Sequence, residues 1–357
     1  MVHLSNSALA GIDTPALLVD LDAMDQNLRT MADFFSNRPT KLRPHFKNHR
    51  VLEFAAMQMA HGAIGITCAR LWQAERLANF GIREILIANE IAGESSLARF
   101  AELSREVPVL IGVDNASVVK DLARLSRNVK AEINVLVDID LGLKRCGVAP
   151  CQPATALAKT VVESGLQFRG FMGYEGHLQP LPPGPEKQRV VTDAARALVE
   201  TRSLAEASGI PVGIVSCGGT GDYSIAGTFP SITEIQAGSY LLMDSWYAPF
   251  APDFQVALTV LATVISTTPG ERLVIDAGCK AISGERGLPS PKNLSGLKLK
   301  ALHAEHGIIE IQGSGSHVEV GNKIEIVVQY HDGTIHLHSR IYGIRNGKIE
   351  RIFSIEQ

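Results

Sequence analysis

Short β-like runs alternate with longer amphipathic segments from residue 17 to about residue 246, and this pattern restricts the fold more than any other property of the chain. The β-like runs are Leu17–Leu21, Lys41–Phe46, Ile64–Cys68, Ile85–Ala88, Val107–Val113, Ile133–Ile139, Phe168–Gly173 and Val212–Ser216. The segments between them, such as Asp22–Phe35 and Ser117–Arg127, repeat apolar residues at helical spacing. Such alternation predicts parallel strands joined by right-handed crossovers. Eight units favour a (β/α)8 barrel, with a doubly wound open sheet as the alternative.

A ninth apolar run, Glu234–Met243, means that either this run or Leu17–Leu21 lies outside the eight barrel strands. After residue 246 strand-like runs follow one another without helices, and one of them is Thr334–Tyr342. This texture predicts an antiparallel β domain. We therefore expect a barrel over residues 13–245 and a C-terminal β domain over residues 246–357, into which residues 1–12 pair through Leu4–Ile12.

Composition excludes several classes of protein. A net charge of −3 and a pI of about 6.4 do not fit a nucleic-acid-binding face. The five cysteines are scattered and form neither a disulfide framework nor a CxxC pair. We find no pattern of a signal peptide and no apolar run of membrane-spanning length. The expectation is a cytoplasmic protein without nucleic-acid or membrane partners.

A dense group of cations ends the second β-like run, in the sequence LRPHFKNHR, where Lys47 stands between His45 and His49. Barrel enzymes carry their reactive groups at the carboxyl ends of the strands. A partly desolvated lysine in such a place can form a Schiff base with a carbonyl compound. A solvated basic loop is the alternative interpretation of this window.

A glycine-rich segment, SCGGTG, follows the eighth run, and a second small-residue segment, Ala237-Gly238-Ser239, follows the ninth. Glycines let backbone N–H groups approach an anion closely, and barrels commonly bind phosphate after their last strands. A simple turn is the alternative for either segment alone, but together they favour phosphate binding. A ligand with a phosphate at one end and a group for Lys47 to attack at the other fits pyridoxal 5′-phosphate. Tyr174 and His177, in GYEGH after the seventh run, are candidates to pack or hydrogen-bond near its ring. A buried tyrosine with a satisfied hydroxyl and a solvated loop histidine are the alternative interpretations.

These residues lie in segments that resemble the D-threonine aldolase/D-serine dehydratase family of alanine-racemase-like, fold-type III pyridoxal-phosphate enzymes. The similar segments are Asp13–Asn27, RPHFKNHR, Ile85–Glu90, Arg145–Pro150, GYEGHLQ, SCGGTGDY, Glu234–Asp244, Val274–Ala281 and Gly343–Glu350. The resemblance implies an alanine-racemase N-terminal-like barrel, a D-serine dehydratase-like β domain, a homodimer and Lys47 as the Schiff-base lysine. It implies that the cofactor is bound by Arg145, Tyr174, Ser216, Gly218, Gly219, Thr220, Gly221, Gly238, Ser239 and Tyr240.

Two departures from the family pattern concern the β-hydroxyl chemistry. Family members carry a divalent metal, such as manganese, zinc or magnesium, on a histidine and on an aspartate or cysteine two residues later. Here Tyr330 stands at the histidine position and Asp332 at the second, so the resemblance leaves His331 and Asp332 as the candidate ligands. The histidine that accepts the β-hydroxyl proton is replaced by Pro180, which leaves His177 as its substitute.

The resemblance implies a lyase, an aldolase or a dehydratase, that acts on β-hydroxy D-amino acids such as D-threonine or D-serine. The alternative is a metal-independent racemase or epimerase that uses Lys47 and Tyr330 as its two acid–base groups. A non-catalytic pyridoxal-phosphate carrier and a barrel enzyme that binds a sugar phosphate are further hypotheses. The histidines of HDGTIHLH (His331, His336 and His338) predict a polar strand face, with His336 and His338 on one side. A metal site unlike that of the family is the alternative.

Overall fold

The computed structural model describes residue 9, residues 11–313 and residues 317–357. The chain packs into two compact units. The barrel unit comprises residues 31–47 and 52–238, and the sheet unit comprises the described residues before 31, residues 48–51 and residues 239–357. The expected pairing of Leu4–Ile12 falls mostly outside the described residues. The domain boundary after residue 245 stays a prediction.

Eight parallel strands form the centre of the barrel unit, in the order β2-β9-β8-β7-β6-β5-β4-β3. They are β2 (Lys41–Leu42), β3 (Ile66–Cys68), β4 (Ile85–Ile87), β5 (Val109–Val113), β6 (Asn134–Ile139), β7 (Gln167–Gly173), β8 (Ile214–Cys217) and β9 (Glu234–Ile235). Ile64 N donates to Leu42 O at 2.9 Å and Thr67 N to Pro44 O at 2.8 Å, which joins the two ends of this order. The barrel expected from the sequence is therefore confirmed.

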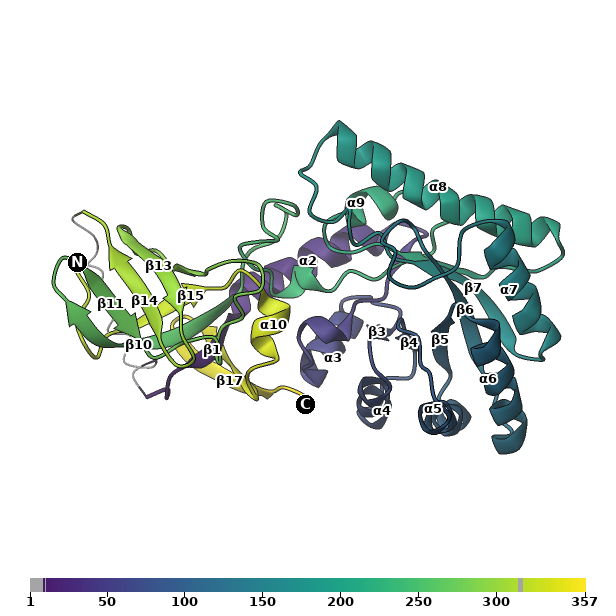
Figure 1. The fold of residues 1–357 in the computed structure, drawn as a ribbon, viewed down its shortest axis with the longest axis horizontal. Coiled ribbons are helices and arrows are strands. Elements are labelled where there is room, and N and C mark those ends of the chain that lie inside the picture. Colours follow the sequence, from purple (N-terminus) through teal and green to yellow (C-terminus); the bar gives the residue numbers. More distant parts are fainter. Residues whose placement is uncertain (1–8, 10, 314–316) are drawn as a thin grey trace. The chain divides into compact units, whose positions relative to one another are not determined.

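Helices alternate with these strands, and Figure 1 shows them in colours from purple (α2) through blue to green-teal (α9). They are α2 (Leu21–Ser36), α3 (Leu52–Ala60), α4 (Leu71–Asn79), α5 (Glu94–Glu106), α6 (Ala116–Val129), α7 (Gln152–Glu163), α8 (Pro185–Ala207) and the short α9 (Tyr223–Ala226). Helix α6 illustrates why they form: Asn115 caps its first turn by accepting from Ser117 N at 2.8 Å, and Val119, Leu122 and Ala123 are buried along one face. No helix in the described ranges is long and apolar enough to cross a membrane.

The barrel strands are apolar on both faces because helices cover one face and the other lines the barrel interior. Leu86, Leu110, Leu136 and Met172, one from each of the neighbouring strands β4 to β7, pack together in one cluster. A buried interior of this kind leaves the strand ends as the places where polar groups can be exposed.

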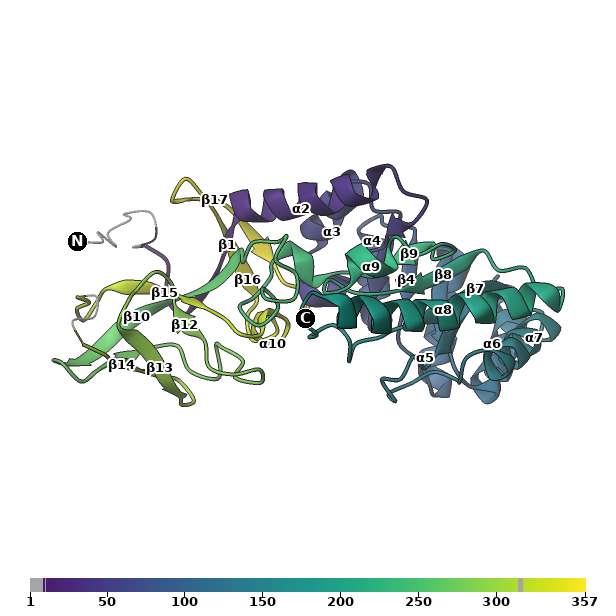
Figure 2. The same cartoon turned by 90° about the horizontal axis from the view of Figure 1, so that it is seen from above.

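The sheet unit is mostly antiparallel, as expected. It contains β1 (Ala16–Asp20), β10 (Leu258–Thr268), β11 (Arg272–Ile275), β12 (Ser290–Pro291), β13 (Leu297–Leu302), β14 (Gly307–Ile311), β15 (Lys323–Val327), β16 (Arg340–Arg345) and β17 (Lys348–Ser354). Most of these strands follow the order β13-β14-β11-β10-β1-β16-β17, and Figure 2 shows β13 and β14 as neighbours. One pairing, between β1 and β16, is parallel.

The run Leu17–Leu21 lies outside the barrel, and the run that begins at Glu234 supplies the eighth barrel strand, β9. Strand β1 pairs antiparallel with β10 and parallel with β16. Its residues Ala16–Val19 are at most 5% exposed. A strand buried on both faces has the same sequence pattern in the centre of a sheet and in a barrel, so the pattern alone does not separate the two.

The prediction of a single strand over Thr334–Tyr342 is wrong at the beginning of this segment. Residues His331–Ile335 form the short helix α10, and β16 begins only at Arg340. His336 and His338 therefore do not share a strand face: His336 Nδ1 lies 2.6 Å from an Arg50 guanidinium nitrogen, and His338 Nε2 lies 2.8 Å from Ala281 O. A helix of five residues is too short to produce a helical period in the sequence.

Candidate active site

Lys47 lies at the carboxyl end of β2, on a single 3-10 turn over Phe46–Asn48. Its side chain is half-buried, whereas Phe46 is fully buried and anchors the turn. The backbone N–H of Lys47 donates to His45 Nδ1 at 3.4 Å. A lysine at a barrel strand end, next to a buried anchor, is held in place by the strand rather than by a loop.

The glycine-rich loop Ser216–Gly221 begins in the last two residues of β8, and three of its backbone N–H groups donate to side chains of the barrel unit. Gly218 N donates to Glu175 Oε2 at 3.3 Å, Gly219 N to Asp222 Oδ1 at 2.7 Å, and Gly221 N to Gln179 Oε1 at 2.8 Å. These donors therefore shape the loop. Phosphate binding by this loop stays a prediction.

Glu175 and Asp222 form a carboxyl pair without solvent exposure beneath this loop. Their side chains share a hydrogen bond, and Gln179 Nε2 also donates to Asp222. Burial, together with the Asp222 charge, raises the pKa of Glu175 well above its usual range. Burial likewise raises the pKa of Asp222 to about 6, although Gly219 N–H and the Lys187 charge oppose this rise. Glu175 is therefore the member that keeps its proton near neutral pH.

We expect Glu175→Gln to flatten the pH dependence of stability. Since the folded-state pKa values of this pair exceed the ordinary carboxyl values, the folded protein binds more protons, and its stability falls as pH rises from about 4 through 6 and beyond. A glutamine amide donates to Asp222 as the protonated acid does, but it does not titrate. The variant should gain on the order of 1 kcal/mol at pH 8 relative to pH 5. Thermal unfolding from pH 5 to 9 measures this, and an unchanged slope would contradict it.

The segment after β9 lies beside the glycine-rich loop because β9 pairs with β8. Gln236 Nε2 donates to Ser216 Oγ at 3.0 Å. Ser239 Oγ accepts from Asn48 Nδ2 at 3.1 Å, and a hydroxyl that accepts in this way can donate its own proton to an anion. Tyr240 is 1% exposed, and its ring centroid lies 5.6 Å from that of Phe254. Tyr240 is therefore packed in the sheet unit.

Arg145 and Tyr174, two predicted cofactor neighbours, are brought together. The Arg145 guanidinium lies 5.5 Å from the centroid of the Tyr174 ring, which fits a cation–π contact. His177 lines a cavity of about 390 Å³ together with Asp140, Leu141 and residues of α8. Lys47 is not among the residues that line this cavity. The cavity therefore gives no support to the prediction that His177 carries a proton in a reaction at Lys47.

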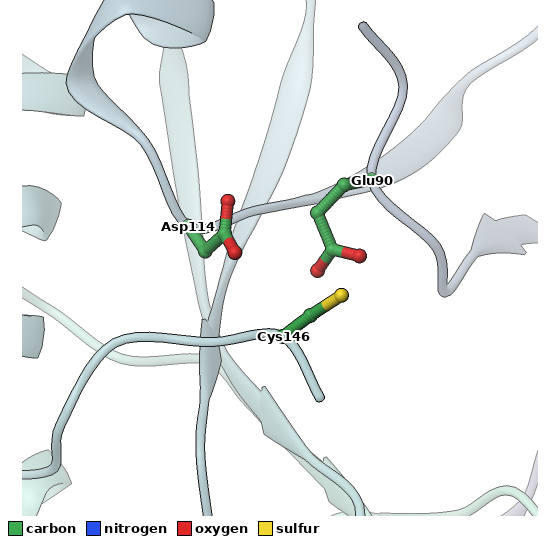
Figure 3. Close-up of side chains that lie close together, drawn as sticks. All are labelled: Glu90, Asp114 and Cys146. Carbon is green, nitrogen blue, oxygen red and sulfur yellow. The ribbon is translucent and has the colours of Figure 1, made fainter. Parts of the chain in front are cut away.

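Three side chains that metal ions favour gather at the ends of β4 and β5 and in the loop after β6, as Figure 3 shows: Glu90, Asp114 and Cys146. The hydrogen bond to Glu90, helped by burial, raises the pKa of Cys146 to about 11. Asp114 already accepts from Gly147 N at 3.1 Å. Burial and the hydrogen bond that protonated Asp138 donates to Glu90 raise the pKa of Asp138. A metal ion binds a deprotonated thiol, but the thiol of Cys146 keeps its proton at neutral pH. These side chains are therefore better suited to share protons through hydrogen bonds than to bind a metal ion.

The sheet unit holds Tyr330, His331 and Asp332 at the start of α10. His331 is 1% exposed, and its Nδ1 lies 2.6 Å from Asp244 Oδ2. Burial disfavours the charged ring, but the Asp244 carboxylate outweighs it and raises the pKa of His331. Burial raises the pKa of Tyr330 to about 12, with Asp332 adding to the rise. Tyr330 is therefore a protonated phenol at neutral pH.

Sequence reasoning missed the groups that hold the glycine-rich loop. Glu175, Gln179 and Asp222 stand inside the segments that were singled out, but only the fold shows that they meet. Lys187, 2% exposed, donates to the carbonyls of Gln179 and Leu181 at 3.1 and 2.9 Å. For Asp222, the sequence offered one indication of a role in the site, its position directly after the glycine-rich turn. For Lys187, the sequence offered no such indication.

Together, the barrel, the strand-end lysine and the glycine-rich loop define an enzyme of the alanine-racemase-like class. The family model of the alanine racemase N-terminal domain matches residues 19–245, and that of a serine dehydratase domain matches residues 257–344. The chain is 34% identical to a D-threonine aldolase from Arthrobacter sp, over 97% of this chain and 93% of the relative. It is 30% identical to a 3-hydroxy-D-aspartate aldolase from Paracoccus denitrificans, over 98% and 94% of the two chains.

Solved structures agree with these relatives. D-Threonine aldolase from Filomicrobium marinum superposes with a TM-score of 0.93 at 33% identity, covering 97% of this chain and 96% of that one. D-threo-3-hydroxyaspartate dehydratase from Delftia sp. gives a TM-score of 0.90 at 25% identity, covering 98% and 99%. A cysteine-to-alanine mutant of D-threo-3-hydroxyaspartate dehydratase is described as metal-free. The chain belongs to the family of D-threonine aldolases and of hydroxyaspartate aldolases and dehydratases, which are lyases. Membership implies pyridoxal 5′-phosphate as the cofactor.

Proposed function

We propose that this protein is a pyridoxal-phosphate-dependent lyase, an aldolase or a dehydratase, that acts on β-hydroxy D-amino acids. The observation that carries the proposal is the position of Lys47 at the carboxyl end of β2. In the barrel order this strand is followed by β9 and β8, whose ends bear Gly238 and the loop Ser216–Gly221. A reactive amine and small-residue, hydroxyl-bearing loops on neighbouring strand ends match the aldehyde and the phosphate of the cofactor.

The residues present fit this cofactor by the chemistry of their donors. Thr220, Gly238 and Ser239 would hold the phosphate through hydroxyl and backbone donors, and Arg145 with Tyr174 would lie toward the ring. When bound, pyridoxal phosphate supplies an aldehyde that condenses with an amine and a ring that takes up the electron pair released at the α-carbon. Lys47 would attach the cofactor and move the α-proton.

A second candidate is a metal-independent racemase in which Lys47 and Tyr330 serve the two faces of the α-carbon. The observation that favours it is a phenol in place of a metal ligand at position 330. The raised pKa of Tyr330, about 12, supports a proton donor there and argues against a phenolate base at neutral pH. The lyase therefore stays the leading proposal.

The test is an assay of the purified protein with pyridoxal phosphate on D-threonine, D-serine and 3-hydroxy-D-aspartate. An aldolase releases glycine with acetaldehyde from D-threonine, or glycine with glyoxylate from 3-hydroxy-D-aspartate. A dehydratase releases ammonia with pyruvate from D-serine, or ammonia with oxaloacetate from 3-hydroxy-D-aspartate. α-Proton exchange into heavy water with formation of the L-isomer, and without cleavage or ammonia, would favour the racemase instead.

A further inference from the structure

The glycine-rich loop Ser216–Gly221 is held by one buried side chain from the loop after β7, the amide of Gln179. Its Oε1 accepts a hydrogen bond from Gly221 N at 2.8 Å, and its Nε2 donates to Asp222. The other oxygen of Asp222 accepts from Gly219 N at 2.7 Å. Gln179 is 1% exposed and Asp222 is fully buried, so these bonds are shielded from water. One amide therefore fixes the loop at two places, directly at Gly221 and through Asp222 at Gly219.

The backbone of Gln179 is fixed as well. Lys187, in the first turn of α8, donates from its ammonium group to Gln179 O at 3.1 Å and to Leu181 O at 2.9 Å. Burial raises the pKa of Asp222, and the charge of the same ammonium group opposes that rise, so Lys187 also favours the ionised carboxylate that Gln179 contacts. Because the backbone and the side chain of Gln179 are both anchored, the amide cannot turn away from the loop without breaking buried hydrogen bonds.

Two of the glycines are required by Gln179 itself. A Cβ added at Gly219 would lie 2.7 Å from Gln179 Oε1, and a Cβ added at Gly221 would lie 2.7 Å from Gln179 O. Both distances are shorter than van der Waals contact, so a side chain at either position would push the loop and the glutamine apart. The two glycines therefore allow the loop after β7 to pack closely against the glycine-rich loop.

The same two loops carry residues that the family resemblance assigns to the ring and to the phosphate of the cofactor. Tyr174, the predicted neighbour of the ring, is followed by Glu175, whose Oε2 accepts from Gly218 N at 3.3 Å. Strands β7 and β8 pair directly, with Met172 opposite Ser216. The position of the glycine-rich loop relative to Tyr174 is thus fixed inside the barrel unit, by the strand pairing and by the contacts between the two loops.

We propose that Gln179 is a positioning residue, which holds the glycine-rich loop in the shape that binds the phosphate of the cofactor and so sets the affinity for that phosphate. This inference rests on the proposed function, in which the loop holds the phosphate. An amide suits the task because it accepts from Gly221 N and donates to Asp222 at the same time, without a charge that would repel a phosphate. Methionine at this position would keep most of the packing and lose both hydrogen bonds.

The test compares pyridoxal phosphate with pyridoxal, which has the same ring and aldehyde but no phosphate. The full-length chain, freed of cofactor with hydroxylamine, is dialysed against increasing concentrations of each compound, and the bound fraction is read from the visible absorbance. In Gln179→Met the dissociation constant of pyridoxal phosphate should rise about 10- to 100-fold, because a buried N–H group and a buried carboxylate lose a partner. That of pyridoxal should change less than about threefold. Equal rises for both compounds would contradict the proposal.

Gln73→Met is the matched control. Gln73 is also 1% exposed and lies in the barrel unit, but its Oε1 accepts from Ala69 N at 2.8 Å and from Arg70 N at 3.2 Å, at the start of α4. This variant should lose a similar amount of thermal stability and keep the ratio of the two dissociation constants. If Gln179→Met does not fold, Gln179→Asn takes its place: it keeps the amide but is one methylene too short for both partners, and the same selective rise is expected.

Two outcomes separate a failure of this inference from a failure of the proposed function. If the original protein binds pyridoxal phosphate no more tightly than pyridoxal, or binds neither, the predicted phosphate site is wrong and both proposals fall. If the original protein prefers pyridoxal phosphate, and a folded variant at Gln179 keeps that preference in full, only the role of Gln179 is wrong.

Discussion

Lys47→Ala is expected to lose turnover by about 10³-fold or more and to lose the visible absorbance of the bound cofactor at the same time. The reason is that one amine performs two tasks, attachment of the cofactor and movement of the α-proton, and alanine performs neither. Borohydride reduction followed by mass spectrometry should place the cofactor on the peptide that contains Lys47 in the unmodified protein. The same treatment of Lys47→Ala should leave that peptide unlabelled.

Lys41→Ala is the matched control for this prediction. Lys41 lies on the same short strand, β2, but its ammonium donates to Phe35 O at 3.4 Å, before the strand end. This variant should keep the cofactor absorbance and turn over within about threefold of the original rate. If Lys47→Ala retained covalently attached cofactor, another lysine would be the attachment site and the proposed chemistry at β2 would be wrong.

The barrel could be predicted from the sequence because each of its strands is a short apolar run followed by an amphipathic helix, and both patterns are local. The place of β1 could not, because Leu17 pairs with Val260 and Ile341, far along the chain, while its burial on both faces imitates a barrel strand. Helix α10 was mistaken for a strand because five residues hold too little of any period. Local sequence patterns thus predicted most helices and strands. Which strands pair with one another depends on contacts between residues far apart in the chain, and these patterns do not contain that information.

The candidate site shows the same division. Lys47 and the glycine-rich loop could be predicted because parallel barrel strands bring their carboxyl ends to one side. The hydrogen-bonding of that loop could not, since Glu175 and Gln179 come from the preceding strand's loop, more than 35 residues away.

Glu234→Gln should destabilise the folded protein by about 3–5 kcal/mol. This is the largest loss of stability that we expect from replacing one barrel residue by an uncharged residue. Arg43 on the extension of β2 and Glu234 on β9 form two hydrogen bonds, at 2.9 and 2.6 Å, and each side chain is only 4% exposed. The arginine has no room to leave: a Cβ added at Gly65 would lie 2.2 Å from its guanidinium. Glutamine would therefore leave a buried, unneutralised charge beside the strand that bears Lys47. Thermal unfolding should show a midpoint about 10 °C lower.

Two comparisons separate this charge effect from the loss of a hydrogen bond. Glu75→Gln breaks an equally short pair with Arg99, at 2.6 Å, but there the arginine is 56% exposed, so the cost should stay below about 1 kcal/mol. The double substitution Arg43→Met with Glu234→Leu removes both charges, and it should be more stable than Glu234→Gln alone, because no buried charge is left without its partner. If Glu234→Gln cost no more than Glu75→Gln, water would be reaching Arg43. The junction of β2 with β9, on which the position of Lys47 depends, would then not be the closed, buried contact that these distances describe.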